Sequence, residues 1–295
     1  PAFNKLLDDI DVKSSLVPIR GLRSACQGRD GDWVIELMPG LKSLMTPGLT
    51  TLDGFRLAWF GLTQFFNRWQ TDPNDALSVM WADQETLADY VTRKLGKNVL
   101  DRLLTPVFQG ARGWNPDKVS AAFFASVTPH LVGRSTVFVL KNGMNELTAA
   151  LAKGKNIHTG TRVLTVGATA DGGCHIAAKR NKERITFKAD IVVSAIEGDR
   201  VTAVFKDLNP EEKAFFDAVT YNPTGIMHYQ IDREPSDYMT FFDQATADTI
   251  AVYQTEKGDR KEGRVHQVFA QLSPSAVAAA TQSGQQADLH SLISE

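Results

Sequence analysis

The chain has 295 residues, of which 43% are hydrophobic and 22% are charged, so it can bury a sizeable core and is typical of a globular protein. Its 32 Lys and Arg residues nearly balance its 34 Asp and Glu residues, and the net charge of -2 provides no broad positive field for nucleic acid. The two cysteines, Cys26 and Cys174, lie far apart without zinc-site spacing, so we expect a reduced, cytoplasmic protein without a metal site.

The N-terminal part is expected to form a short helix followed by strands. Phe3, Leu6, Leu7 and Ile10 recur at helical spacing, which indicates a helix with one buried stripe. Residues 16–38 contain two extended runs around the turn signal GRDGD, and this pattern predicts a hairpin-like pair of strands.

Residues 49–127 are predicted to be helical. A second helical run follows the first, and Pro106 is expected to kink or stop it. In NPDKVSAAFFASV, Asn115 is a candidate cap and Pro116 lies in the first turn of one more helix. The first run, LDGFRLAWFGLTQFFNRW, places large apolar side chains on one wide aromatic face: Phe55, Trp59, Leu62, Phe66 and Trp69.

From residue 136 onward, short strands and turns prevail. A strand, a turn and a helix from about Asn145 to Lys153 come first, and several short strands follow. The last of these, Asp190 to Ile196, is apolar on both sides, which is typical of a strand buried on both faces. Residues 206–295 begin with a capped helix and continue as strands of a further sheet. The alternation predicts an α+β fold whose chain passes repeatedly between subdomains.

Four segments carry a family resemblance. They are ETLADYVTRKLGKNVLDRLLTPVFQGARGWNPDKVSAAFF, FVLKNGMNELTAALAK, IHTGTRVLTVGATADGGCHIAA with KADIVVSAI, and YNPTGIMHYQIDRE. Each is loose by itself, but in this order they resemble the flavin-containing amine oxidase superfamily, most closely its protoporphyrinogen oxidase-like branch. The resemblance implies an FAD-dependent oxidoreductase that oxidises an apolar or amine-bearing small molecule by hydride transfer to flavin.

The resemblance also implies a domain organisation. It predicts a mixed-sheet substrate domain with a helical subdomain, plus the central part of a Rossmann-like FAD-binding domain. The family's G-x-G-x-x-G phosphate loop and its closing Gly-rich segment do not occur in the sequence, so we expect the central part of a longer flavoprotein. The expected boundaries are 1–45 for substrate-domain strands, 46–135 for the helical subdomain, 136–205 for the FAD-binding part and 206–295 for the substrate-domain sheet.

Five residues are predicted to contact ligands by this resemblance. Val163 would make a backbone contact to the adenine end of FAD, although it could also be an ordinary strand residue. Tyr229, Phe241 and Phe242 would line the substrate pocket, with core packing as the simpler interpretation. Arg112 would pair with a carboxylate substrate at the entrance, with a surface role as the simpler interpretation. The sequence indicates no catalytic residue.

Two alternatives remain open at this point. The aromatic helix Phe55–Trp69 would contact a membrane if the protein works as the protoporphyrinogen oxidase-like branch does, and the protein would then be membrane-associated. Burial against neighbouring helices is the simpler interpretation. The missing glycine motif also allows a second function, a non-catalytic protein that binds a hydrophobic ligand in the same fold without a cofactor.

Overall fold

The computed structural model describes residues 2–20, 22–28, 31–73, 75–133, 136–232, 239–243, 248–256 and 266–283. The chain folds into two compact units, each with its own internal packing. The first contains Pro1–Ser15 and Asn142–Tyr221, and the second contains Leu16–Lys141 and Asn222–Glu295. Residues 1–15 and 206–221 thus group with 142–205, a division that differs from the boundaries expected from the resemblance.

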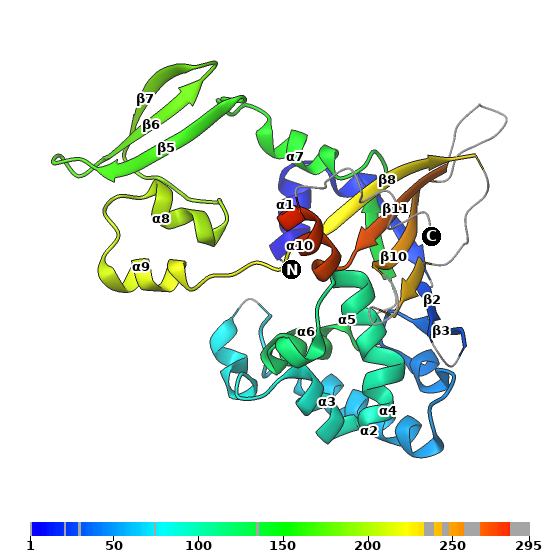
Figure 1. Cartoon of the computed structure of the whole chain (residues 1–295). Helices are drawn as coiled ribbons and strands as arrows, with labels where there is room; N and C mark the ends of the chain where they lie inside the picture. The colour runs from blue at the N-terminus through cyan, green and yellow to red at the C-terminus, as the bar shows by residue number, and fades with distance from the viewer. Residues whose placement is uncertain are drawn as a thin grey trace. The chain divides into compact units, whose positions relative to one another are not determined.

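The first unit is built around a three-stranded antiparallel sheet in the order β5-β6-β7. Helix α9 begins with Pro210 and a capping box in which Asn209 and Glu212 bond each other's backbone N–H groups, as the sequence predicts. Figure 1 shows α8 and α9 near this sheet. The elements are α1 (Ala2–Asp9), α7 (Asn145–Ala152), β5 (Thr161–Ala168), β6 (Cys174–Arg180), β7 (Glu183–Ala189), α8 (Val201–Val204) and α9 (Pro210–Asp217).

The segment Asp190 to Ile196 is not a strand. Ile191 and Val193 are 81% and 86% exposed, so the prediction of a strand buried on both faces is wrong. A buried strand needs a partner on each side for its N–H and C=O groups, and no strand pairs with this segment among the described residues. The apolar composition of the segment shows that its side chains are suited to burial, but it does not show whether a partner strand lies beside the segment.

The second unit contains a six-stranded sheet in the order β3-β2-β9-β10-β11-β8, in which only β2 and β9 are parallel. The predicted hairpin is confirmed as β2 and β3. A separate antiparallel ribbon joins β1 to β4, a pairing between distant segments that the sequence does not reveal. The strands are β1 (Leu16–Arg20), β2 (Arg23–Gln27), β3 (Trp33–Glu36), β4 (Thr136–Leu140), β8 (Gly225–Ile231), β9 (Met239–Phe242), β10 (Thr249–Glu256) and β11 (His266–Leu272).

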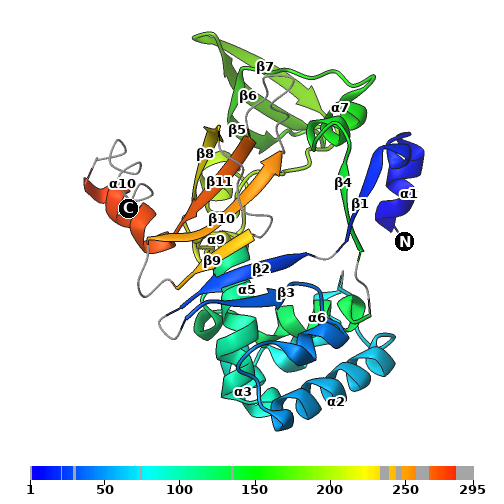
Figure 2. The same ribbon diagram turned by 90° about the vertical axis from the view of Figure 1, so that its right-hand side faces the viewer.

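Helices α2, α3, α5 and α6 of the second unit lie on one side of β2 and β3 (Figure 2). Pro106 neither stops nor breaks the helical run, because a π-helical turn precedes it and the chain continues directly into α5. The helix expected to start at Pro116 begins instead at Ala121, after a short 3-10 turn. The helices are α2 (Thr51–Asn67), α3 (Leu87–Leu95), α4 (Lys97–Val99), the π-helical η4 (Leu100–Leu104), α5 (Thr105–Arg112), α6 (Ala121–Leu131) and α10 (Pro274–Ser283), with 3-10 turns η2 (Leu41–Met45), η3 (Ala76–Ala82) and η5 (Pro116–Lys118).

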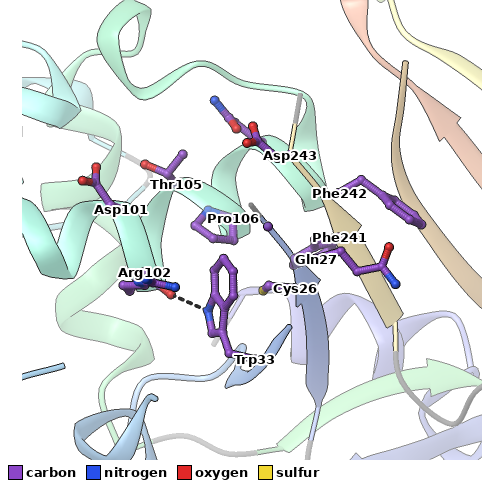
Figure 3. Close-up of a pocket in the computed structure, with 12 residues that line it drawn as sticks. Cys26, Gln27, Trp33, Asp101, Arg102, Thr105, Pro106, Phe241, Phe242 and Asp243 are labelled. Atoms are coloured by element: carbon purple, nitrogen blue, oxygen red, sulfur yellow. Dashed lines mark hydrogen bonds between the residues drawn. The ribbon is translucent and has the colours of Figure 1, made fainter. Parts of the chain in front are cut away.

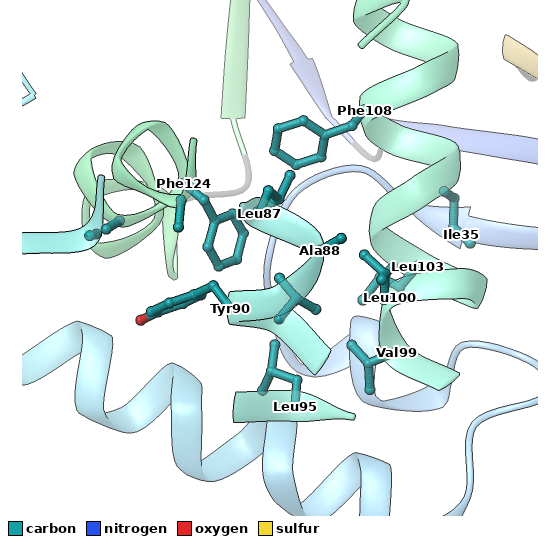
Figure 4. Packing of buried hydrophobic residues seen from close by; sticks show 14 of the residues in the cluster. Ile35, Leu87, Ala88, Tyr90, Leu95, Val99, Leu100, Leu103, Phe108 and Phe124 are labelled. Atoms are coloured by element: carbon teal, nitrogen blue, oxygen red, sulfur yellow. The ribbon is translucent and has the colours of Figure 1, made fainter. Parts of the chain in front are cut away.

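The core of the second unit lies between these helices and one face of the sheet (Figure 4). Phe124 of α6 stacks on Phe60 of α2 with 6.0 Å between ring centroids, and Tyr90 of α3 meets both rings edge-on. Cys26 of β2 and Phe241 of β9 close the core from the sheet. Apolar burial on this scale is the main stabilising contribution to the unit.

Helix α2 faces the core with only one side. Leu57 and Phe60 pack against the core, and Asp53 is buried in a capping box with Thr50, where Asn98 also donates to its carboxylate at 2.8 Å. The predicted aromatic face of α2 points away from these residues and is exposed. The interpretation that this face is buried against neighbouring helices is therefore wrong.

Candidate functional site

A pocket of about 330 Å³ opens in the second unit, where the ends of β2 and β9 meet the helical run from η4 into α5 (Figure 3). Its volume lies at the lower end of the range found for small-molecule sites. The lining combines aromatic, polar and charged side chains from β2, β3, η4, α5 and β9 and from the residues that directly follow β2 and β9. The residues are Cys26, Gln27, Gly28, Trp33, Asp101, Arg102, Thr105, Pro106, Gln109, Phe241, Phe242 and Asp243.

Trp33 forms a fixed wall of this pocket. Its indole N–H donates to the backbone carbonyl of Arg102 at 3.0 Å, and the Arg102 guanidinium lies 5.0 Å from the ring centroid. Gly28 leaves room for the ring, because a Cβ at this position would lie 2.7 Å from an indole carbon. A hydrogen bond, a cation–π contact and a close backbone approach therefore hold one indole in place.

The Arg102 carbonyl can accept from Trp33 because Pro106, four residues later, offers it no N–H. In a regular helix the Arg102 carbonyl would accept from the N–H four residues later, but that residue is Pro106, which has no N–H. The π-helical turn Leu100–Leu104 carries the chain past this position, and Trp33 supplies the donor instead. Short π-helical turns are frequent at functional sites.

The floor of the pocket is buried and chemically inert. Burial raises the pKa of the Cys26 thiol to about 12, so the sulfur stays protonated at neutral pH and is a poor nucleophile. Phe241 is 1% exposed and lies against α5 at Gly110, where a Cβ would come within 2.3 Å of the Phe241 ring. The floor is therefore a packing surface for an apolar group.

Charged groups stand at the rim. Asp101 and Asp243 carry carboxylates and Arg102 carries the one guanidinium among the lining side chains, so the formal charge of the lining is negative. Lys97 binds Asp101 at 3.0 Å, but both side chains are exposed and the pair contributes little stability. Aromatic walls beneath a negative rim are suited to a ligand with an apolar body and a cationic group.

The structure brings together two of the residues predicted from the resemblance. Phe241 and Phe242 both line the pocket. Tyr229 lies on β8, at the opposite edge of the sheet from β3, opposite Val268 of β11. Arg112 is exposed and lies over the rings of two aromatic residues near the end of α5, outside the pocket lining: Trp114 at 5.1 Å and Phe123 at 5.6 Å.

Ten of the twelve lining residues were not predicted from the sequence to line a pocket, and Trp33, Arg102 and Asp243 are among them. Trp33 and Arg102 come from segments about 70 residues apart, and Asp243 directly follows β9, much later in the chain. The only local signal was Pro106 inside a helical pattern, which implies a carbonyl without its usual donor. That signal identifies a carbonyl that lacks the N–H of residue 106, but not the side chain that binds it.

Val163 lies in the first unit, on β5, which is an edge strand. Its side chain is 42% exposed, and a register shift between Val163 and Thr165 leaves Leu164 as an extra residue in the pairing with β6. The outer edge of β5 is covered farther along, where the N–H of Lys206 donates to the carbonyl of Val166 at 3.0 Å. Among the described residues of the first unit, no backbone hydrogen bond of this kind covers the Val163 end of the edge.

The described residues contain neither a cluster of potential metal ligands nor a helix that could cross a membrane. No cluster of His, Cys, Asp and Glu side chains within the described ranges is arranged to hold a metal ion. None of the helices in the described part of the chain combines the length and the apolar content needed to span a bilayer.

Comparison with known proteins gives a family and a fold. Residues 34–273 match the family described as flavin containing amine oxidoreductase. Wild-type putrescine oxidase bound to putrescine is structurally similar, with a TM-score of 0.61 and 14% identity, over 92% of this chain and 62% of that chain. The PF1083 protein from Pyrococcus furiosus gives a TM-score of 0.59 and 13% identity, over 98% and 69%.

At such low identities the structural likeness shows the fold alone, a mixed α+β architecture shared with putrescine oxidase. The chain spans less than two thirds of the length of putrescine oxidase. No curated protein matches the sequence significantly.

Proposed function

The chain belongs to the family of flavin-containing amine oxidoreductases, and from this premise we propose that the protein is an FAD-dependent oxidoreductase that oxidises an amine-bearing or apolar small molecule by hydride transfer to flavin. The observation that carries the proposal is the family match over residues 34–273, which spans both units. The finer assignment to the protoporphyrinogen oxidase-like branch rests on the four sequence segments and is part of the proposal.

The residues of the first unit fit one end of FAD. Val163 presents an exposed apolar side chain beside the open edge of β5, and edge-strand N–H and C=O groups can bond an adenine while such a side chain covers its ring. No G-x-G-x-x-G motif occurs in the 295 residues, so the proposal assigns this chain the adenine contact and not the pyrophosphate contact. FAD bound in this way would supply the acceptor for hydride.

The pocket of the second unit is proposed to bind the substrate. Phe242 and Trp33 would contact its apolar part, and Asp243 would attract an amine through the negative rim. These side chains orient the substrate and exclude water from it, while the protonated Cys26 takes no part in the chemistry. Arg112 and Tyr229 lie outside this pocket, and a role for them in substrate binding stays a prediction.

A matched pair of variants tests the cofactor contact. Val163→Glu puts a charge where the adenine ring would lie, and we expect FAD to bind about tenfold more weakly, which is about 1.4 kcal/mol. Val139→Glu is the control, because Val139 is also 42% exposed on a strand but lies in the second unit. Fluorescence titration with FAD measures both dissociation constants. Equal affinities for the two variants would remove the adenine contact from the proposal.

A second pair tests the substrate pocket. Anaerobic mixing of the flavin-loaded enzyme with a panel of amines and neutral apolar compounds identifies which of them reduce the flavin. Asp243→Asn is expected to raise KM at least tenfold for amines and to leave KM for neutral compounds unchanged. Asp117→Asn, at an exposed carboxylate outside the pocket, should change neither. If no compound reduces the flavin although FAD is bound, the proposed chemistry is wrong.

A further inference from the structure

The outward face of α2 carries a regular apolar stripe that the proposed oxidation does not use. The spacings between successive members are three, four, three, four and three residues, which is the a/d pattern of a helix that packs along another helix. The residues of this α2 stripe are all exposed: Leu52 (56%), Phe55 (69%), Trp59 (62%), Leu62 (49%), Phe66 (66%) and, just after the helix end, Trp69 (82%).

The flanks of the stripe are compatible with a second helix. Arg56 and Thr63 border the stripe on one side, and Ala58 and Phe65 border it on the other. Arg68 lies over the ring of Phe65 at 4.3 Å and so lies against the helix. The stripe therefore has one charged side chain directly beside it.

We propose that the α2 stripe is a dimer interface in which two copies of this chain pack their α2 helices antiparallel. When two stripes pack antiparallel, the sizes of the opposed side chains match. A two-fold axis between residues 60 and 61 places each Leu of the stripe against a Trp of the second copy and each Phe against a Phe. The opposed pairs are Leu52 with Trp69, Phe55 with Phe66, and Trp59 with Leu62.

The charges also permit this arrangement. Across the axis, Arg56 comes to the level of residue 65 of the second copy, on the flank that presents Thr63 and Gln70. Two Arg56 side chains are thus kept apart. Asp53 does not intervene, because it is buried in its own capping box.

The area is sufficient for a stable dimer. Four aromatic and two leucine side chains at these exposed fractions present roughly 700 Å² of apolar surface per copy. Two copies would bury about 1,400 Å², within the range of specific protein–protein interfaces. Monomeric proteins rarely leave an apolar patch of this size exposed.

A membrane is the other occupant that an aromatic helix could meet. Helices that lie on bilayers usually carry many Lys and Arg residues on the polar face, whereas α2 contains no Lys and only Arg56, with Arg68 at its end. The chain's net charge of -2 adds no attraction to anionic lipid. A strict a/d spacing is what a partner helix requires and a fluid bilayer does not, so the second copy is favoured.

The test compares two equally exposed tryptophans in the complete gene product. Sedimentation velocity should show a dimer for the wild type and a monomer for Trp59→Glu, since Trp59 lies next to the axis. Trp81→Glu should stay dimeric, because Trp81 is 59% exposed on η3 and lies outside the stripe. Circular dichroism and flavin content of each variant show whether it is folded.

A charge-pairing experiment tests the antiparallel register itself. Two double variants, Trp59→Glu with Leu62→Glu and Trp59→Lys with Leu62→Lys, should each be monomeric and should form a heterodimer when mixed. A wild type that is monomeric at all concentrations overturns the proposal, as does a dimer that persists in Trp59→Glu. Membrane contact replaces the dimer proposal if the wild type is a monomer that floats with vesicles of phosphatidylcholine and phosphatidylglycerol and the Trp59→Glu variant does not float. None of these outcomes depends on whether the protein oxidises a substrate.

Discussion

Gly110 determines how closely α5 can lie on β9. A Cβ at this position would overlap the ring of Phe241, which is itself buried between the helix and the sheet. Gly110→Ala should therefore lower the free energy of unfolding by about 1–3 kcal/mol through overpacking. Gly61→Ala is the control, because Gly61 lies in α2 with open space around it, and Ala there should stabilise the helix by up to about 1 kcal/mol. Urea denaturation measures both, and equal effects would contradict the packing argument.

Cys26 makes stability depend on pH in the alkaline range. Burial raises its pKa from 9.0 to about 12, so the folded state keeps a proton that the unfolded chain releases above pH 9. The stabilisation is fully present below pH 9 and is lost as the pH rises from 9 to about 12. Between pH 8 and 10.5 the wild type should lose roughly 1–2 kcal/mol more than Cys26→Ala. Urea midpoints at both pH values measure this, and parallel losses in the two proteins would show that the thiol is not protected.

At the scale of elements, one hydrogen bond joins β3 to the turn from η4 into α5. Trp33→Phe keeps a ring but leaves the Arg102 carbonyl without the indole donor, and should cost about 1–2 kcal/mol. In a Pro106→Ala background the backbone N–H of residue 106 can bond that carbonyl, so the same change should cost at least 0.5 kcal/mol less, as an order-of-magnitude estimate. A double-mutant cycle by urea denaturation gives the coupling. An additive result would mean that Pro106 is not the reason for the Trp33 contact.

Local sequence patterns predicted where helices and strands form more accurately than they predicted which other segments pack against them. The periodicity of α2 and the turn signal between β2 and β3 identified both correctly, because these depend on neighbouring residues. The side of α2 that is buried was predicted wrongly. Five large apolar residues at regular spacing indicate a contact face, but the spacing does not show which partner lies on that face. The same limitation explains why Asp190 to Ile196 was expected to be a buried strand.

At the scale of the whole molecule, the sequence cannot show which distant segments meet. The pairing of β2 with β9 joins residues more than 200 positions apart, and it places Cys26 beside Phe241 in one pocket. Phe241 and Phe242, which were named as neighbours of the aligned strand that carries Tyr229, line this pocket, whereas Trp33 and Arg102 required the three-dimensional arrangement. The chain also crosses between the two units three times, so the unit boundaries cannot be predicted from changes in composition along the sequence.

The central claim is that this member of the amine oxidoreductase family works with bound FAD. The most direct measurement is the visible absorption spectrum of the complete gene product after purification, followed by titration with FAD. We predict the absorption bands of oxidised flavin in the purified protein, and their loss when a substrate is added without oxygen. A colourless protein that stays colourless and gains no bound FAD on titration would contradict the claim.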